Sequence, residues 1–204
     1  MKVPTIEKSI EYINYAKSTN PGEWIDHSYN VAIAARSIAN ECSDLDGNIA
    51  YVLGLLHDIG RHEGRVQLHH TVSGYNFLMK DGYEDAARIA ITHSFVIPDI
   101  RVYGGKSDCT EEEIMFIKKY LNKVTYNDYD KLIQLCDNIS LPEGVCLMEK
   151  RLLDVVMRYG FNDFTLKKWE KYLELRDYFS NKIGKSIYKV LEGVVETTFD
   201  FDYK

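Results

Sequence analysis

Apolar residues recur at helical spacing along almost the whole chain, whereas the strict alternation typical of β-strands is nearly absent. Capping residues bound many of these segments, and few Gly or Pro residues interrupt them. Because an amphipathic helix must bury its apolar face against another element, a chain of such helices is restricted to helix-on-helix packing. The pattern therefore predicts an all-α fold, a helical bundle, over residues 1–204.

Local signals set the expected helix boundaries. Thr110 and Glu113 form a capping-box pattern at the start of one helix, and Gly82, Gly160 and Gly184 are typical residues after a helix end. The expected helices cover about residues 5–18, 24–42, 44–60, 69–81, 85–92, 111–121, 128–139, 145–159, 166–182 and 187–191. The C-terminal tail is the one segment that could form a short strand instead. The longest loops, about 61–68 and 94–109, are the expected lids or substrate loops.

Composition indicates a single globular domain and excludes several partners. The chain has 204 residues, of which 45% are hydrophobic and 27% are charged. With 25 basic and 31 acidic residues its net charge is −6, which argues against binding to long nucleic acids. No apolar run is long enough to span a membrane, and the four cysteines lack the close spacing of metal or redox motifs. We expect a cytoplasmic location, and the sequence leaves the oligomeric state open.

Several histidine and aspartate side chains fall on apolar helix faces, where an unpartnered polar group is costly to bury. These residues share helix faces with Ile, Leu, Val or Ala and are therefore expected to point inward. They are His27, His57 with the adjacent Asp58, His93 and Asp137. A lone inward histidine is usually a hydrogen-bonded core residue, but one core would have to satisfy all these groups together. One divalent metal ion, or two sharing a carboxylate, would do so. Imidazole and carboxylate ligands suit Fe, Mn, Co, Ni or Zn, with Mg also possible.

The order of these residues, together with His70 and the run Leu55–Gly60, resembles the HD superfamily of metal-dependent phosphohydrolases. It is most similar to the single-domain bacterial branch that includes the HD-type diadenosine tetraphosphate hydrolases. The resemblance covers about residues 24–140 and implies an all-α bundle with two metals, so residues 145–204 would be a C-terminal helical extension. Two features depart from that branch, namely the inserted segment 98–124 and Ser94, where those hydrolases usually have Thr.

The resemblance also implies roles for individual residues. It assigns one metal to His27, His57, Asp58 and Asp137, and a second metal to His70 and His93, with Asp58 as the bridge. It implies hydrolysis of a phosphoester or phosphoanhydride in a small nucleotide-like molecule by a metal-activated water. We expect Asp58 and Arg61 to be the catalytic residues. The expected substrate contacts are the basic residues that follow the His-Asp pair, Arg61, His62 and Arg65.

Two other functions fit the same sequence. An HD-type diiron oxygenase would consume oxygen and require reduced iron. A non-catalytic nucleotide-binding or regulatory domain would be purified without metal, although the full set of expected ligands argues against it. The charged face of residues 149–158 is typical of a solvated surface, but Arg151 or Arg158 could reach back toward the site.

Overall fold

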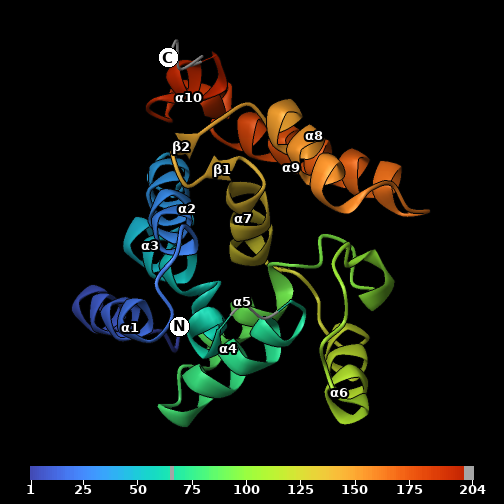
Figure 1. Ribbon diagram of the computed structural model, residues 1–204. Coiled ribbons are helices and arrows are strands. Elements are labelled where there is room, and N and C mark those ends of the chain that lie inside the picture. Colours follow the sequence, from blue (N-terminus) through green and yellow to red (C-terminus); the bar gives the residue numbers. More distant parts are fainter. Residues whose placement is uncertain (65–66, 200–204) are drawn as a thin grey trace, which may run out of the picture.

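Two antiparallel helices, α2 (Trp24–Ala39) and α3 (Gly47–Leu56), pack along each other on the left of Figure 1 and are named the central pair here, because most of their residues are buried. The α2 face contains several buried alanines, and a Cβ on Gly54 of α3 would lie 2.8 Å from the Cα of Ala32. Since that distance is too short for two carbons, glycine at this position allows the close approach of the helices. The close packing brings the start of α2 next to the end of α3.

A computed structural model describes residues 1–64 and 67–199. In these residues the chain folds into ten α-helices, three short 3₁₀ helices and one small hairpin. The other α-helices are α1 (Ile6–Thr19), α4 (His69–Lys80), α5 (Glu84–Thr92), α6 (Glu111–Leu121), α7 (Asp128–Asp137), α8 (Met148–Tyr159), α9 (Thr165–Lys182) and α10 (Val194–Phe199). The 3₁₀ helices are η1 (Ile59–Glu63), η2 (Ile100–Val102) and η3 (Ile187–Lys189). The predicted all-α class is therefore confirmed.

Some boundaries differ from those expected. The helix predicted to end at Gly60 ends at Leu56, and the 3₁₀ helix η1 follows it. The helix predicted to start at residue 145 starts at Met148, because the preceding residues form an antiparallel hairpin of β1 (Ser140–Leu141) and β2 (Gly144–Val145). The tail considered as a strand is helical in α10, and residues 200–204 lie outside the described part.

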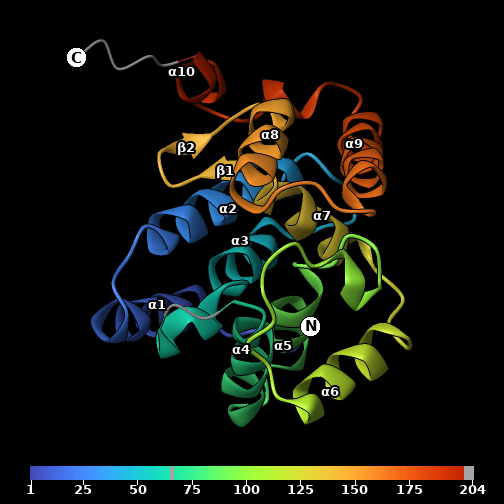
Figure 2. The same cartoon turned by 45° about the vertical axis from the view of Figure 1, so that its right-hand side comes forward.

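Helix α7 joins the central pair to the rest of the molecule, because it packs against α2, α3, α5 and α9. Helix α9 packs against α7, and Figure 2 shows α8 and α9 above α7, on the side away from α4 and α5. Lys182 of α9 binds Asp128 of α7 at 2.6 Å and Asp44 at 2.7 Å. The C-terminal part of the chain is thus attached to the bundle by buried apolar contacts and by this ion-pair cluster.

The inserted segment 98–124 has its own apolar cluster. Val102, Ile117 and Leu121 of this segment are buried against Val72 and Ile91 of α4 and α5. Helix α6 begins with the expected capping box, in which Thr110 accepts from the Glu113 backbone N–H and Glu113 accepts from that of Thr110. The segment is therefore packed onto the bundle, with η2 beside the cavity described below. None of the helices in the described residues has the length and apolar character needed to cross a membrane.

Candidate metal centre

His57 and Asp58 lie where α3 ends, which lets two adjacent side chains enter one cavity. In a continuing helix neighbouring side chains diverge by about 100°. Asp58 leaves helical geometry, with φ −102° and ψ 12°, and η1 begins at the next residue. Both side chains are almost completely buried, at 0% exposure for His57 and 6% for Asp58. The helix end thus aims both groups inward.

Gly60 brings η1 against α4 and so places Asp58 beside His70. A Cβ on Gly60 would lie 1.9 Å from the carbonyl oxygen of His70 and 2.4 Å from the backbone nitrogen of Gly74. Only glycine fits a backbone approach this close. Asp58 Oδ1 consequently lies 3.2 Å from His70 Nε2 and 3.5 Å from His93 Nε2. Packing thus explains the spacing of His70 and Gly74, because the backbone of both residues contacts Gly60.

The other expected ligands reach the same place from separate helices. His27 lies in the first turn of α2, and Asp137 is the last residue of α7. Asp137 Oδ1 lies 3.0 Å from His27 Nε2 and 3.7 Å from His57 Nε2. His93 caps the end of α5, with its Nε2 only 3.2 Å from that of His70. All six expected ligands therefore converge on one cavity.

Backbone carbonyls set the orientation of three of the imidazoles. The Nδ1 atoms of His57, His70 and His93 face the carbonyl oxygens of Gly54, Gln67 and Ile89, respectively. Since a carbonyl only accepts, each Nδ1 must carry the proton and donate it. In the neutral ring Nε2 then presents a lone pair to the cavity. Metal-binding histidines commonly have this arrangement, in which one ring nitrogen is held by a hydrogen bond and the other is available.

The cavity retains buried polar atoms that residues 1–64 and 67–199 do not satisfy. His57 Nε2 and Asp58 Oδ1 have no hydrogen-bond partner there. The Nε2 atoms of His70 and His93 face each other as two acceptors. A bound cation would satisfy these lone pairs. Two groups of ligand atoms lie close enough together to hold one cation each. The first group is His27, His57 and Asp58, and the second is Asp58, His70 and His93. The residues present therefore fit metal ions, with Asp58 common to both groups.

The pKa shifts keep the potential ligands in the forms that bind cations. Burial lowers the pKa of His57 to about 4 and that of His70 to about 3, so both rings are neutral near pH 7. Burial alone would raise the pKa of Asp58, but Arg61 and the surrounding histidines outweigh it and hold the pKa well below its usual range. The pKa of Asp137 is lowered in the same way, chiefly by His27 against the opposing effect of burial.

The three basic residues expected to contact substrate have different positions. Arg61 lines the cavity, where its Nε donates to Asp58 Oδ2 at 2.6 Å. His62 does not line it, because the turn of η1 directs its ring toward Tyr15 and Phe77. The expected substrate contact by His62 is therefore corrected, and Arg65 lies outside the described residues.

His69, the neighbour of the ligand candidate His70, lies outside the centre. Its Nε2 lies 3.0 Å from Glu63 and its Nδ1 lies 3.0 Å from Glu113. It therefore connects η1 to α6 of the inserted segment.

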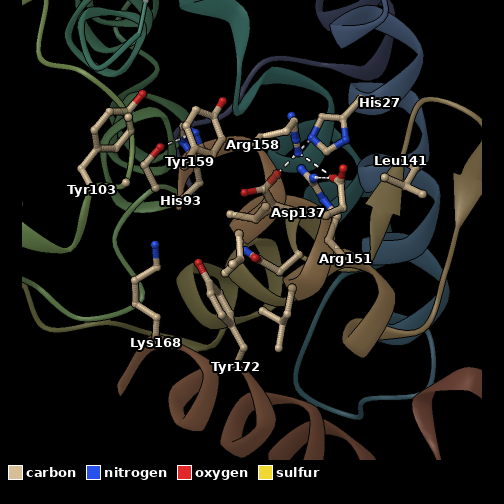
Figure 3. Close-up of a pocket in the computed structure, with 18 of the residues that line it drawn as sticks. His27, His93, Tyr103, Asp137, Leu141, Arg151, Arg158, Tyr159, Lys168 and Tyr172 are labelled. Atoms are coloured by element: carbon tan, nitrogen blue, oxygen red, sulfur yellow. Dashed lines mark hydrogen bonds and ion pairs between the residues drawn. The ribbon is translucent and has the colours of Figure 1, made fainter. Parts of the chain in front are cut away.

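The C-terminal extension supplies the opposite wall of the cavity, which has a volume of about 740 Å³. Figure 3 shows Lys168 and Tyr172 entering from α9 on the side facing His27. Arg151 and Arg158 of α8 also line the cavity, and both bind Asp154. Sequence reasoning allowed for one of these arginines but missed Lys168, since its neighbours give no local signal of burial. Five aromatic residues complete the lining, Trp24, Tyr103, Tyr159, Trp169 and Tyr172.

Comparison with known proteins gives one match. A family model described as HD domain matches residues 24–141, which is more than half of the chain. The match includes all six residues that converge on the centre, and it ends before α8 and α9. Searches of curated proteins and of solved structures found nothing that matches the chain.

Proposed function

The chain belongs to the HD-domain family, and from this premise we propose that it is a metal-dependent phosphohydrolase. The proposed reaction is hydrolysis of a phosphoester or phosphoanhydride in a small, nucleotide-like molecule. The observation that carries the proposal is the pair of buried His/Asp groups that share Asp58. Two neighbouring cation sites joined by one carboxylate suit phosphoryl transfer, because they match the charge on both the attacking and the leaving oxygens.

In this proposal His27, His57, Asp58 and Asp137 would hold one ion, and His70 and His93 would hold a second, with Asp58 shared by both sites. Divalent ions at such a site lower the pKa of water and polarise phosphoryl oxygens. The protein residues fix the ligands beforehand: the backbone carbonyls of Gly54 and Gln67 orient two of the imidazoles. Such preorganised ligands need little rearrangement when charge develops during the reaction.

Arg61 is a positioning residue in this scheme. Its Nε donates a hydrogen bond to Oδ2 of Asp58, and the other carboxylate oxygen, Oδ1, then faces His70 and His93. The guanidinium also borders the cavity, so we propose that it contacts a phosphoryl oxygen of the bound substrate. Arg61 would thus have the catalytic and substrate-binding roles expected of it.

The lining of the cavity supports a phosphorylated, partly aromatic substrate. Cationic side chains of α8 and α9 lie near aromatic rings such as Trp24 and Tyr172. Nucleobases stack on such rings, while phosphates bind the cations. A cavity of about 740 Å³ has the size of a small-molecule site.

The test is hydrolysis under anaerobic conditions. Protein stripped of metal is reloaded separately with Mn²⁺, Fe²⁺, Co²⁺, Ni²⁺, Zn²⁺ or Mg²⁺ and assayed on p-nitrophenyl phosphate, mononucleotides and diadenosine tetraphosphate. We expect release of phosphate or nucleotide with at least one metal, and its loss in His57→Ala. If no substrate is hydrolysed, and oxygen uptake by the iron-loaded protein depends on an added organic substrate, the hydrolase proposal fails in favour of an oxygenase.

A further inference from the structure

Lys168 of α9 places an amino group on the cavity wall opposite α2. Its side chain is half-buried, and its Nζ donates to the carbonyl oxygen of Val102 at 3.1 Å. No carboxylate of residues 1–64 or 67–199 forms an ion pair with it, and burial lowers its pKa. The side chain therefore carries a charge into a partly desolvated place, where an anion would stabilise it.

Three arginines of the lining differ from Lys168 in this respect, whereas Lys150 of α8 resembles it, since its Nζ donates to the carbonyl oxygen of Thr197 and it has no ion pair in the described residues. Arg61 binds Asp58, and the guanidinium groups of Arg151 and Arg158 both bind Asp154. Each of these three guanidinium groups has a carboxylate partner, although Arg151 and Arg158 share one. Lys168 has no such partner in the described residues, so an anionic ligand in the cavity could neutralise it.

Gly104 lies beside Lys168 at the cavity wall. A Cβ added to Gly104 would lie 3.7 Å from Lys168 Nζ and 3.9 Å from Cβ of Tyr159. Those are ordinary contact distances, and Gly104, Lys168 and Tyr159 all line the cavity that contains the metal centre. An ammonium group has three N–H donors, so the bond to Val102 leaves two for another acceptor.

We propose that Lys168 forms a second anion-binding subsite, and that the ligand of this cavity carries a further anionic group besides the phosphoryl group at the metal centre. The inference rests on the proposed function and narrows its substrate to molecules with at least two anionic groups. Lys168 lies outside the matched residues 24–141, so the family likeness does not assign it. The C-terminal extension thereby determines specificity, while the matched part supplies the metal ligands.

The experiment compares ligands that differ only in the second charge. Alkanediol bisphosphates of four to eight carbons and the alkyl monophosphates of equal length are measured as competitive inhibitors of p-nitrophenyl phosphate hydrolysis. Their binding to the metal-loaded protein is measured in parallel by calorimetry, which does not depend on hydrolysis of p-nitrophenyl phosphate. Lys168→Met removes the charge, Lys168→Arg keeps it, and Lys171→Met is the matched control, because Lys171 is exposed on the same helix and binds Glu174.

In the unmodified protein the best bisphosphate should bind about tenfold more tightly than the monophosphate of equal length, because one charged hydrogen bond contributes about this much to affinity. Lys168→Met should abolish this preference while monophosphates bind within about twofold of the original affinity. Lys168→Arg and Lys171→Met should retain the preference. If Lys168→Met is unstable, Lys168→Gln replaces it, since the amide can still donate to Val102.

Two results would overturn the subsite: no preference for bisphosphates in the unmodified protein, or an undiminished preference in Lys168→Met. If p-nitrophenyl phosphate is hydrolysed while either result is found, the subsite fails and the proposed function stands. If no phosphoester is hydrolysed, the proposed function fails, and the calorimetric comparison still decides whether Lys168 binds the second anion.

Discussion

Replacing Asp58 with alanine tests the shared position of this carboxylate. Asp58 belongs to both groups of potential ligands, so its loss should weaken both cation sites together. Alanine is preferred to asparagine, whose amide oxygen could still coordinate and whose N–H could donate to His70. We expect metal analysis of the purified variant to find at least one ion fewer per chain than in the unmodified protein, and hydrolysis to fall below detection.

The same substitution has a second, calculable effect in metal-free protein. Asp58 and Arg61 are joined at 2.6 Å, with side-chain exposures of 6% and 32%. Removing one partner of a buried pair usually costs 3–5 kcal/mol, because the other charge stays buried. Since a third of Arg61 remains exposed, we expect the lower end of that range, about 3 kcal/mol in the free energy of unfolding.

A double-mutant cycle separates this cost from general damage. Urea unfolding in chelator is measured for Asp58→Ala, Arg61→Met and the double variant. Because the double variant contains neither charge, it should be more stable than the sum of the single losses by about 2 kcal/mol. A coupling below about 0.5 kcal/mol would show that the pair is not desolvated. Retention of the full metal content by Asp58→Ala would refute the shared-ligand geometry.

Four further substitutions test the supporting structure. Gly60→Ala should lower the free energy of unfolding by about 3 kcal/mol and reduce the metal content, because the new Cβ would lie 1.9 Å from the carbonyl oxygen of His70. Gly104→Ala is the control: its Cβ would make only ordinary contacts, so the free energy of chemical unfolding should change by less than about 0.5 kcal/mol. Thr110→Ala should cost about 1 kcal/mol through the lost cap of α6 without changing metal stoichiometry, and a loss of metal would contradict the separation of α6 from the centre. Asp128→Asn should cost about 1–2 kcal/mol at pH 7, because the ion pairs and hydrogen bonds of Asp128 outweigh burial and lower its pKa to about 2. The stabilisation by a carboxylate with a lowered pKa is complete above its unfolded value near 3.8 and disappears as the pH falls toward 2, so the unfolding curves of Asp128→Asn and the unmodified protein should converge there.

Helical periodicity determined the fold class and the inward direction of His27, His57, His93 and Asp137. This succeeded because the faces of a helix follow from residue spacing, and a polar side chain on an apolar face is visible without knowledge of its partners. The joint presence of several such residues indicated a metal centre, and the structure gathers them in one cavity.

Tertiary structure decided what periodicity could not. The early end of α3 at Leu56 aims Asp58 inward, and the turn of η1 separates Arg61 in the cavity from His62 outside it. A helical pattern extended to Gly60 does not contain that change of direction. It depends on the close contact of Gly60 with α4, which lies ten residues further along the chain.

The role of the C-terminal extension was equally hidden from the sequence. Lys168 lies in a segment rich in charged residues, where a solvated surface is the ordinary expectation. It lines the cavity only because α9 packs on α7 and faces the start of α2. Local spacing shows which side of a helix is apolar. It does not show which distant helix will pack against that side, because this depends on long-range contacts. The wall of the cavity formed by α8 and α9 results from such contacts.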